Sequence, residues 1–166
     1  LTGGRSLVRL RDGRLLSYVE RGDPDGAPVV YFHGPLGAGE EWPLPDADLH
    51  GIRLLVPERP GFGGSEPVSE RLRSDWVPDI EDWADQIGLK RFSIVAWSFG
   101  CAYALNCAAW LRDRVTGLDL VSSPAPVERQ TFFTAYGKTV LTSAALVNLL
   151  PGIATLVARG LHASAQ

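Results

Sequence analysis

The chain lacks several features that would place it in a specialised class of protein. Its 166 residues include no methionine and only two cysteines, and the formal net charge is −3. Without a basic surplus, we expect no nucleic-acid partner. Cys101 and Cys107 fall on one expected helix, where their Cα atoms would be roughly 9 Å apart, beyond the reach of a disulfide. We therefore expect two reduced, packed cysteines, as in a cytoplasmic protein.

Signals for export and for cofactor binding are also missing. The first ten residues contain no apolar stretch of the kind found in a secretory signal, and they do not begin with methionine. We expect either a rare start codon read as leucine or a partial reading frame. The sequence contains no cluster of metal ligands and no dinucleotide-binding fingerprint, so we expect no metal and no cofactor. The length favours one globular domain.

Apolar segments and turn residues follow one another in the order typical of an α/β protein. Asp12 and Gly13 predict a hairpin between two antiparallel strands. Gly88 is expected to end the first helix. The expected strands are residues 7–10, 15–20, 29–32, 52–56, 92–95 and 115–121, and the expected helices are residues 76–87 and 101–111. A hairpin followed by strands alternating with helices predicts a mostly parallel sheet with flanking helices.

Ser98 lies between an expected strand and an expected helix, with Ala96 and Gly100 two positions away on either side. Small residues are needed there because a sharp turn brings the strand and the helix backbones close together. Such a turn lifts the serine hydroxyl above the sheet, next to a helix N-terminus that favours negative charge. The spacing predicts a nucleophile elbow with Ser98 as the nucleophile. A helix N-cap serine is the structural alternative.

Two further loops follow expected strands. One begins with His33 and Gly34, and the other covers residues 58–65. Because the carboxyl ends of parallel strands share one edge of a sheet, we expect both loops to lie near Ser98.

Together these three loops resemble the α/β-hydrolase superfamily, over about residues 9–126. The His33-Gly34 segment resembles its oxyanion loop. Residues 58–65, Glu-Arg-Pro-Gly-Phe-Gly-Gly-Ser, resemble its Asp-Arg-Pro-Gly-x-Gly-x-Ser loop, with Glu58 in the aspartate position. The serine at the elbow argues against the dehalogenases and epoxide hydrolases of the superfamily, which use aspartate.

The resemblance implies hydrolysis of an ester or similar acyl bond of a small molecule, through an acyl-enzyme on Ser98. The backbone N–H of Phe99 would be one oxyanion donor. Pro35 stands where the family has the second donor and carries no N–H, so either Leu36 takes over or the oxyanion hole is weaker. His33 and Gly34 would shape this loop. Arg59 would brace it, with contact to an anionic substrate as the alternative.

The resemblance also implies a triad acid and a triad histidine, and the sequence offers no good candidate for either. We interpret His50 as a surface residue and His162 as part of a polar tail, and Asp119 falls inside an expected strand. The acid and the base are therefore expected beyond Gln166. On this interpretation the chain is the N-terminal part of a hydrolase, truncated after about the sixth strand.

Residues 139–158 carry no charged side chain, a length that just suffices for a membrane span. Pro151 and Gly152 divide the segment, which favours two short helices instead. The segment resembles the start of a hydrolase cap, so we expect a core over residues 1–123 and a helical cap from residue 124 to residue 166. We expect no membrane partner, although a membrane-tethered module stays open.

An inactive truncated protein, an aminopeptidase and a C–C bond hydrolase of the same fold are the further alternatives. The oligomeric state is not predicted.

Overall fold

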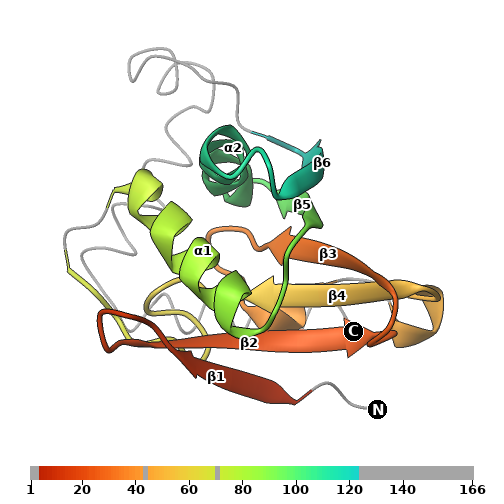
Figure 1. Cartoon of the computed structure of the whole chain (residues 1–166), viewed down its shortest axis with the longest axis horizontal. Coiled ribbons are helices and arrows are strands. Elements are labelled where there is room, and N and C mark those ends of the chain that lie inside the picture. Colours follow the sequence, from red (N-terminus) through yellow and green to blue (C-terminus); the bar gives the residue numbers. More distant parts are fainter. Residues whose placement is uncertain (1–3, 43–44, 70–71, 124–166) are drawn as a thin grey trace. The chain divides into compact units, whose positions relative to one another are not determined.

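The computed structural model describes residues 4–42, 45–69 and 72–123, in which six strands form one sheet (Figure 1). The strands are β1 (Arg5–Arg9), β2 (Leu15–Gly22), β3 (Ala27–Phe32), β4 (Ile52–Pro57), β5 (Phe92–Trp97) and β6 (Val115–Val121). Their order in the sheet is β1-β2-β4-β3-β5-β6. β2 is antiparallel to β1 and β4, whereas β3 is parallel to β4 and β5, and β5 is parallel to β6. The mostly parallel sheet predicted from the sequence is confirmed.

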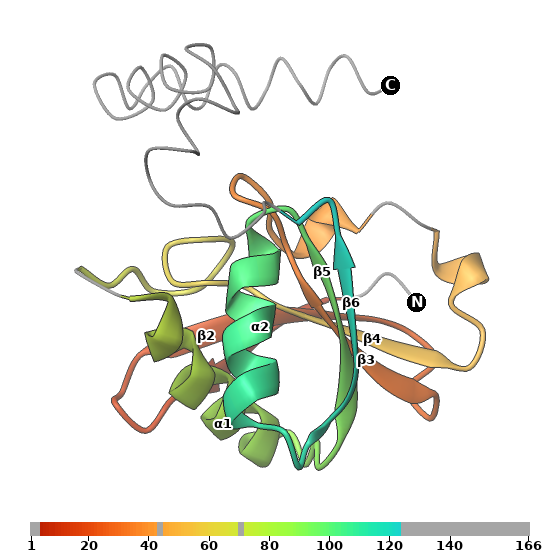
Figure 2. The same ribbon diagram turned by 90° about the horizontal axis from the view of Figure 1, so that it is seen from above.

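Two α-helices, α1 (Trp76–Gln86) and α2 (Gly100–Trp110), cover the same face of the sheet (Figure 2). Three short 3-10 helices complete the described elements: η1 (Gly39–Glu41), η2 (Asp46–Asp48) and η3 (Arg73–Asp75). Val30 and Phe32 pack with residues of the two α-helices in the larger apolar cluster. Tyr31, which points to the other face because side chains alternate along a strand, belongs to a smaller cluster with Leu49.

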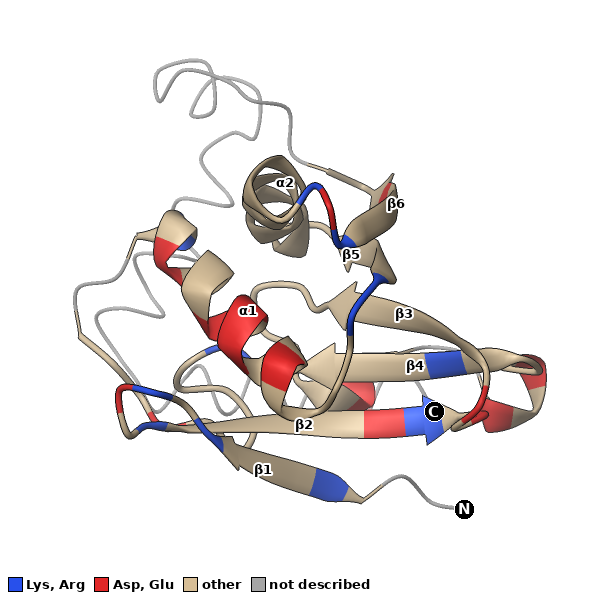
Figure 3. Cartoon of the chain, in the orientation of Figure 1, with Lys and Arg blue, Asp and Glu red and all other residues tan. Residues whose placement is uncertain are grey.

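Helix α1 shows why the sequence pattern gives this packing. Its apolar residues recur at helical spacing, and Ile80 and Trp83 are fully buried against the sheet. Acidic positions recur along the same helix (Figure 3), and two of them, Asp79 and Asp82, are buried beside arginines of the β1–β2 turn. There Arg14 forms an ion pair with Asp79 at 2.7 Å. Burial of a side chain the size of Ile80 stabilises the fold by about 1.5–3 kcal/mol. The Arg14–Asp79 pair is itself largely buried, so its attraction is offset by the cost of removing both charges from water.

The local predictions agree with the structure to within a few residues. Gly13 has a φ of 90° in the β1–β2 hairpin, and Gly88 has a φ of 70° just after α1. Cys101 and Cys107 are both free and buried. Within the described residues, no helix is both long and apolar enough to cross a membrane. The expected cap, residues 124–166, lies outside the described residues, and so does His162.

Candidate active site

Ser98 occupies the turn between β5 and α2 in a backbone conformation that non-glycine residues rarely adopt. Its φ is 53°, which costs about 1–3 kcal/mol and persists only where the surroundings impose it. Its N–H donates to the carbonyl oxygen of Val121 at 2.9 Å, and its own carbonyl oxygen accepts from the N–H of Cys101 at 3.1 Å. The turn is therefore tied to both β6 and the first turn of α2.

Gly100 permits this turn because the start of α2 lies directly against the end of β3. A Cβ atom at position 100 would lie 2.3 Å from the carbonyl oxygen of Phe32 and 2.8 Å from that of His33. Both neighbours are backbone atoms, which cannot move aside as a flexible side chain could. Steric exclusion thus fixes the position of Ser98 relative to the loop after β3.

The backbone N–H of Phe99 forms no hydrogen bond with any other described residue. It lies immediately before α2, where the helix dipole favours negative charge. Trp97 and Phe99, on either side of the serine, are exposed by 41% and 37%. Trp97 also lines an apolar cavity of about 340 Å³ together with Tyr31, Glu41, Trp42, Val95 and Val121. Phe99 is not among the lining residues.

The loop after β3 is held by two groups of opposite charge. Its Gly34 N–H donates to Oε1 of Glu41 at 2.7 Å, and its Gly34 carbonyl oxygen accepts from the Arg59 guanidinium at 2.5 Å. A second guanidinium nitrogen of Arg59 donates to the carbonyl oxygen of His33, also at 2.5 Å. Hydrogen bonds to ionised groups are roughly twice as strong as neutral ones, so this peptide segment is firmly oriented.

The next two residues of this loop differ in what they can donate. Pro35 and Leu36 are both exposed, and proline has no N–H. The N–H of Leu36 forms no hydrogen bond within the described part of the chain. Of Gly34, Pro35 and Leu36, the last is therefore the residue with an N–H that no described group occupies.

His33 is fully buried, and both of its ring nitrogens form hydrogen bonds with backbone groups at the site. Nδ1 lies 3.0 Å from the carbonyl oxygen of Gly34, and Nε2 accepts the backbone N–H of Arg59 at 3.3 Å. Burial, aided by the nearby Arg59 charge, lowers the pKa of His33 to about 3. The imidazole is therefore neutral near pH 7 and has no free nitrogen to accept a proton from Ser98.

Arg59 is 6% exposed and lies between two aromatic rings. Its guanidinium carbon is 4.9 Å from the centre of the Phe62 ring and 5.0 Å from that of Tyr103. Burial lowers the pKa of Arg59 to about 10, so it stays charged at neutral pH. The rings and the two loop carbonyls compensate for the loss of water around this cation.

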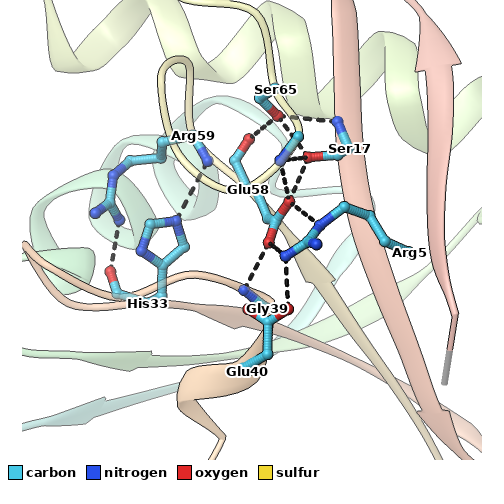
Figure 4. A network of polar contacts seen from close by, with 9 residues as sticks. Arg5, Ser17, His33, Gly39, Glu40, Glu58, Arg59 and Ser65 are labelled. Carbon is cyan, nitrogen blue, oxygen red and sulfur yellow. Dashed lines mark hydrogen bonds and ion pairs between the residues drawn. The ribbon is translucent and has the colours of Figure 1, made fainter. Parts of the chain in front are cut away.

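Glu58 organises a second polar network next to this loop (Figure 4). Its buried carboxylate accepts from Arg5, at 2.9 Å from each of two nitrogens, and from the hydroxyl of Ser17. It also accepts the backbone N–H of Gly39 at 2.8 Å and that of Gly64 at 2.9 Å. Burial alone would raise the pKa of Glu58, but these hydrogen bonds outweigh it and lower the pKa to about 2.

Neither His50 nor Asp119 forms a hydrogen bond with Ser98 in the part of the chain that the structure describes. His50 is exposed and lies just before β4, at the amino ends of the parallel strands, opposite the edge that carries Ser98. Asp119 is exposed in the middle of β6, paired with Val95. Within the described residues, no group of three or more His, Cys, Asp or Glu could hold a metal ion.

Glu41, Arg5 and Ser17 hold the site together, and no motif in the sequence identifies them. Glu41 follows another glutamate, and no sequence pattern separates the two. Arg5 and Ser17 contact Glu58 from far along the chain. Of this network, the sequence indicates Glu58 alone, because the loop motif has an acidic residue at that position.

Residues 29–165 match the alpha/beta hydrolase family, and the chain belongs to this family. It is 31% identical over 111 residues to proline iminopeptidase of Neisseria gonorrhoeae, covering 62% of this chain and 34% of that protein. It is 32% identical over 105 residues to haloalkane dehalogenase of Agrobacterium fabrum, with 62% and 34% covered. The chain thus spans about a third of the length of these curated relatives.

Solved structures agree with this assignment. A thermophilic esterase from Thermogutta terrifontis, determined with malate bound, superposes with a TM-score of 0.66 at 25% sequence identity. The similarity covers 76% of this chain and 48% of the esterase. A structure with this score shares the arrangement of strands and helices described above.

Proposed function

We propose that this chain forms the N-terminal part of a serine hydrolase that cleaves an ester or similar acyl bond of a small molecule. One observation carries the proposal: Ser98 has a φ of 53° in a turn imposed by the packing of Gly100 on backbone carbonyls. Strained serines with such support are characteristic of nucleophiles exposed above an α/β sheet. An N-cap serine would not require this conformation.

In the proposed reaction, Oγ of Ser98 attacks the substrate carbonyl and transfers its proton to a histidine base. The base returns the proton to the departing alcohol, and water then hydrolyses the acyl-enzyme. The base and its acid partner are assigned to parts of the protein outside the described residues. Residues 124–166 would begin a cap over the substrate, and the protein would act in the cytoplasm.

The developing oxyanion would be stabilised by two backbone N–H groups that no described residue occupies. Phe99 supplies one at the N-terminus of α2, and Leu36 supplies the other from the loop after β3. Pro35 cannot donate, and the Gly34 N–H is bonded to Glu41. This shifts the second donor one residue along the loop. Loss of one such donor typically lowers the rate by about 10²–10³-fold.

A fluorophosphonate probe tests the nucleophile on the protein encoded by the complete reading frame. We expect one modified serine, mapped to Ser98 by peptide mass spectrometry, and no labelling of Ser98→Ala. Ser122→Ala is the matched control because Ser122 also has a positive φ, 51°, and follows β6 at the same edge of the sheet. Equal labelling of the wild type and Ser98→Ala would refute the assignment, and so would loss of labelling in Ser122→Ala alone.

An aminopeptidase acting on an N-terminal proline is the second candidate, favoured by the relatives named proline iminopeptidase. Both candidates use the same serine and the same oxyanion donors. Hydrolysis of prolyl-β-naphthylamide alongside p-nitrophenyl acetate separates them, because a strict esterase cleaves only the second compound. If the protein folds but neither hydrolyses these two compounds nor reacts with the probe, the alternative of an inactive truncated protein is correct.

A further inference from the structure

The Glu41 carboxylate lies inside the bend of the loop that begins at Gly34. Besides the Gly34 N–H, its Oε1 accepts the hydroxyl of Tyr31 at 3.0 Å, which ties it to β3. On the other side, a Cβ atom at Gly37 would lie 1.3 Å from Oε2 of Glu41. The carboxylate therefore occupies the space that a side chain at position 37 would fill, and the loop runs around it.

Gly34 is thereby held at both of its polar backbone groups by ions of opposite sign. Its N–H donates to Glu41 and its carbonyl oxygen accepts from Arg59. These two bonds fix the orientation of the peptide planes on each side of Gly34. Because Pro35 has a restricted φ, only its ψ separates the Leu36 N–H from the fixed Gly34 carbonyl, so the direction of that N–H depends in part on how Gly34 is held.

We propose that Glu41 is a positioning residue for the oxyanion hole: by holding Gly34, it orients the N–H of Leu36 toward the substrate oxygen. The inference rests on the proposed function, since it assumes acyl transfer at Ser98. Within the described residues Glu41 forms hydrogen bonds with Tyr31 and Gly34 and none with Ser98, so it acts on the reaction through the loop. Its removal lowers the rate of attack by Ser98 and leaves the serine and the Phe99 N–H in place.

Glu40 provides the matched control. It is the adjacent residue of the same type, but its side chain is 69% exposed and forms an ion pair with Arg5. Nothing in the geometry connects it to Gly34. Glu41→Ala and Glu40→Ala therefore each remove one carboxylate. The Glu41 carboxylate lies inside the bend of the loop, and the Glu40 carboxylate lies outside it.

The experiment measures kcat and KM for p-nitrophenyl acetate and the rate of fluorophosphonate labelling, using the protein encoded by the complete reading frame. We expect Glu41→Ala to lower kcat and the labelling rate by about 10–100-fold, as expected for a misplaced oxyanion donor, and to change KM less than about threefold. Glu41→Gln keeps an oxygen that accepts the Gly34 N–H and is expected to restore most of the rate. Glu40→Ala should stay within about twofold of the wild type.

A single substitution that leaves Glu41 in place, Gly37→Ala, keeps the test valid if Glu41→Ala is poorly folded. Gly37→Ala forces the carboxylate away from the loop and should lower kcat by a comparable factor. In the Glu41→Ala background the same change meets no carboxylate and should cost little further rate, a departure from additivity that reveals direct coupling. Additive effects, or a Glu41→Ala enzyme with wild-type kcat, would overturn the proposal. Absence of Ser98 labelling in the wild type would instead refute the proposed function.

Discussion

The turn after β5 and the loop after β3 are in contact, yet different forces hold their backbones. Around Ser98 the constraint is steric, because Gly100 packs against the carbonyl oxygens of Phe32 and His33. Around Gly34 the constraint is electrostatic, because Arg59 and Glu41 bond its two polar groups. The position of Ser98 thus depends on side-chain volume at the neighbouring residues, and the position of the loop depends on the charges of Arg59 and Glu41. The two regions should therefore fail under different perturbations.

The largest expected effect comes from adding one methyl group to the steric side. Gly100→Ala places a Cβ 2.3 Å from a backbone oxygen, so the free energy of unfolding should fall by more than about 3 kcal/mol. Urea denaturation measures the change. In Gly117→Ala the nearest heavy atom to the new Cβ is 3.6 Å away, in Ser93, and the expected change is below about 0.5 kcal/mol. Similar losses in both variants would contradict the steric account.

Lowering the pH should affect the loop through His33. Its pKa is about 3 in the folded protein and about 6.5 in an unfolded chain. The unfolded state therefore binds the extra proton between these values, and stability should fall by about 1.4 kcal/mol per pH unit as pH drops below about 6.5. Chemical denaturation at pH 7.0, 6.0 and 5.0 measures this slope.

The His33 prediction has its own matched pair. His33→Gln should flatten the slope between pH 6.5 and 5, because it removes the titrating group. The wild type, measured in parallel, should keep the full slope. An unchanged slope in His33→Gln would place the pH sensitivity elsewhere in the protein.

The smallest effect concerns the strain at Ser98. Ser98→Gly removes the strain of the positive φ, because glycine adopts this conformation freely, whereas Ser98→Ala keeps the strain. Both substitutions remove the hydroxyl. The glycine variant should therefore be the more stable of the two, by up to about 1 kcal/mol, after the greater flexibility of glycine in the unfolded chain is included. Thermal unfolding of the two variants measures the difference. A more stable alanine variant would show that the turn is not strained.

The steric side of this comparison could be predicted from the sequence, and the charged side only in part. Alternation and helical spacing gave the sheet, the hairpin and both helices, because burial imposes those periods. Gly100 is predictable from the sequence because a sharp turn needs a small residue. Glu41 and Glu40 are indistinguishable by type and position, and only the folded loop gives them different surroundings. The Arg5–Glu58 pair joins distant segments, so no local pattern predicts it.

The contact of Gly100 with the end of β3 also has a consequence for the order of folding. It joins residues that are far apart in the chain, and it exists only once β3 and β5 lie side by side in the sheet. Such long-range contacts form late, after the entropy of closing the intervening chain has been overcome. A partly folded chain would hold Ser98 in a relaxed conformation and leave it unreactive. Reactivity of this serine during refolding would therefore report when the parallel sheet has been completed.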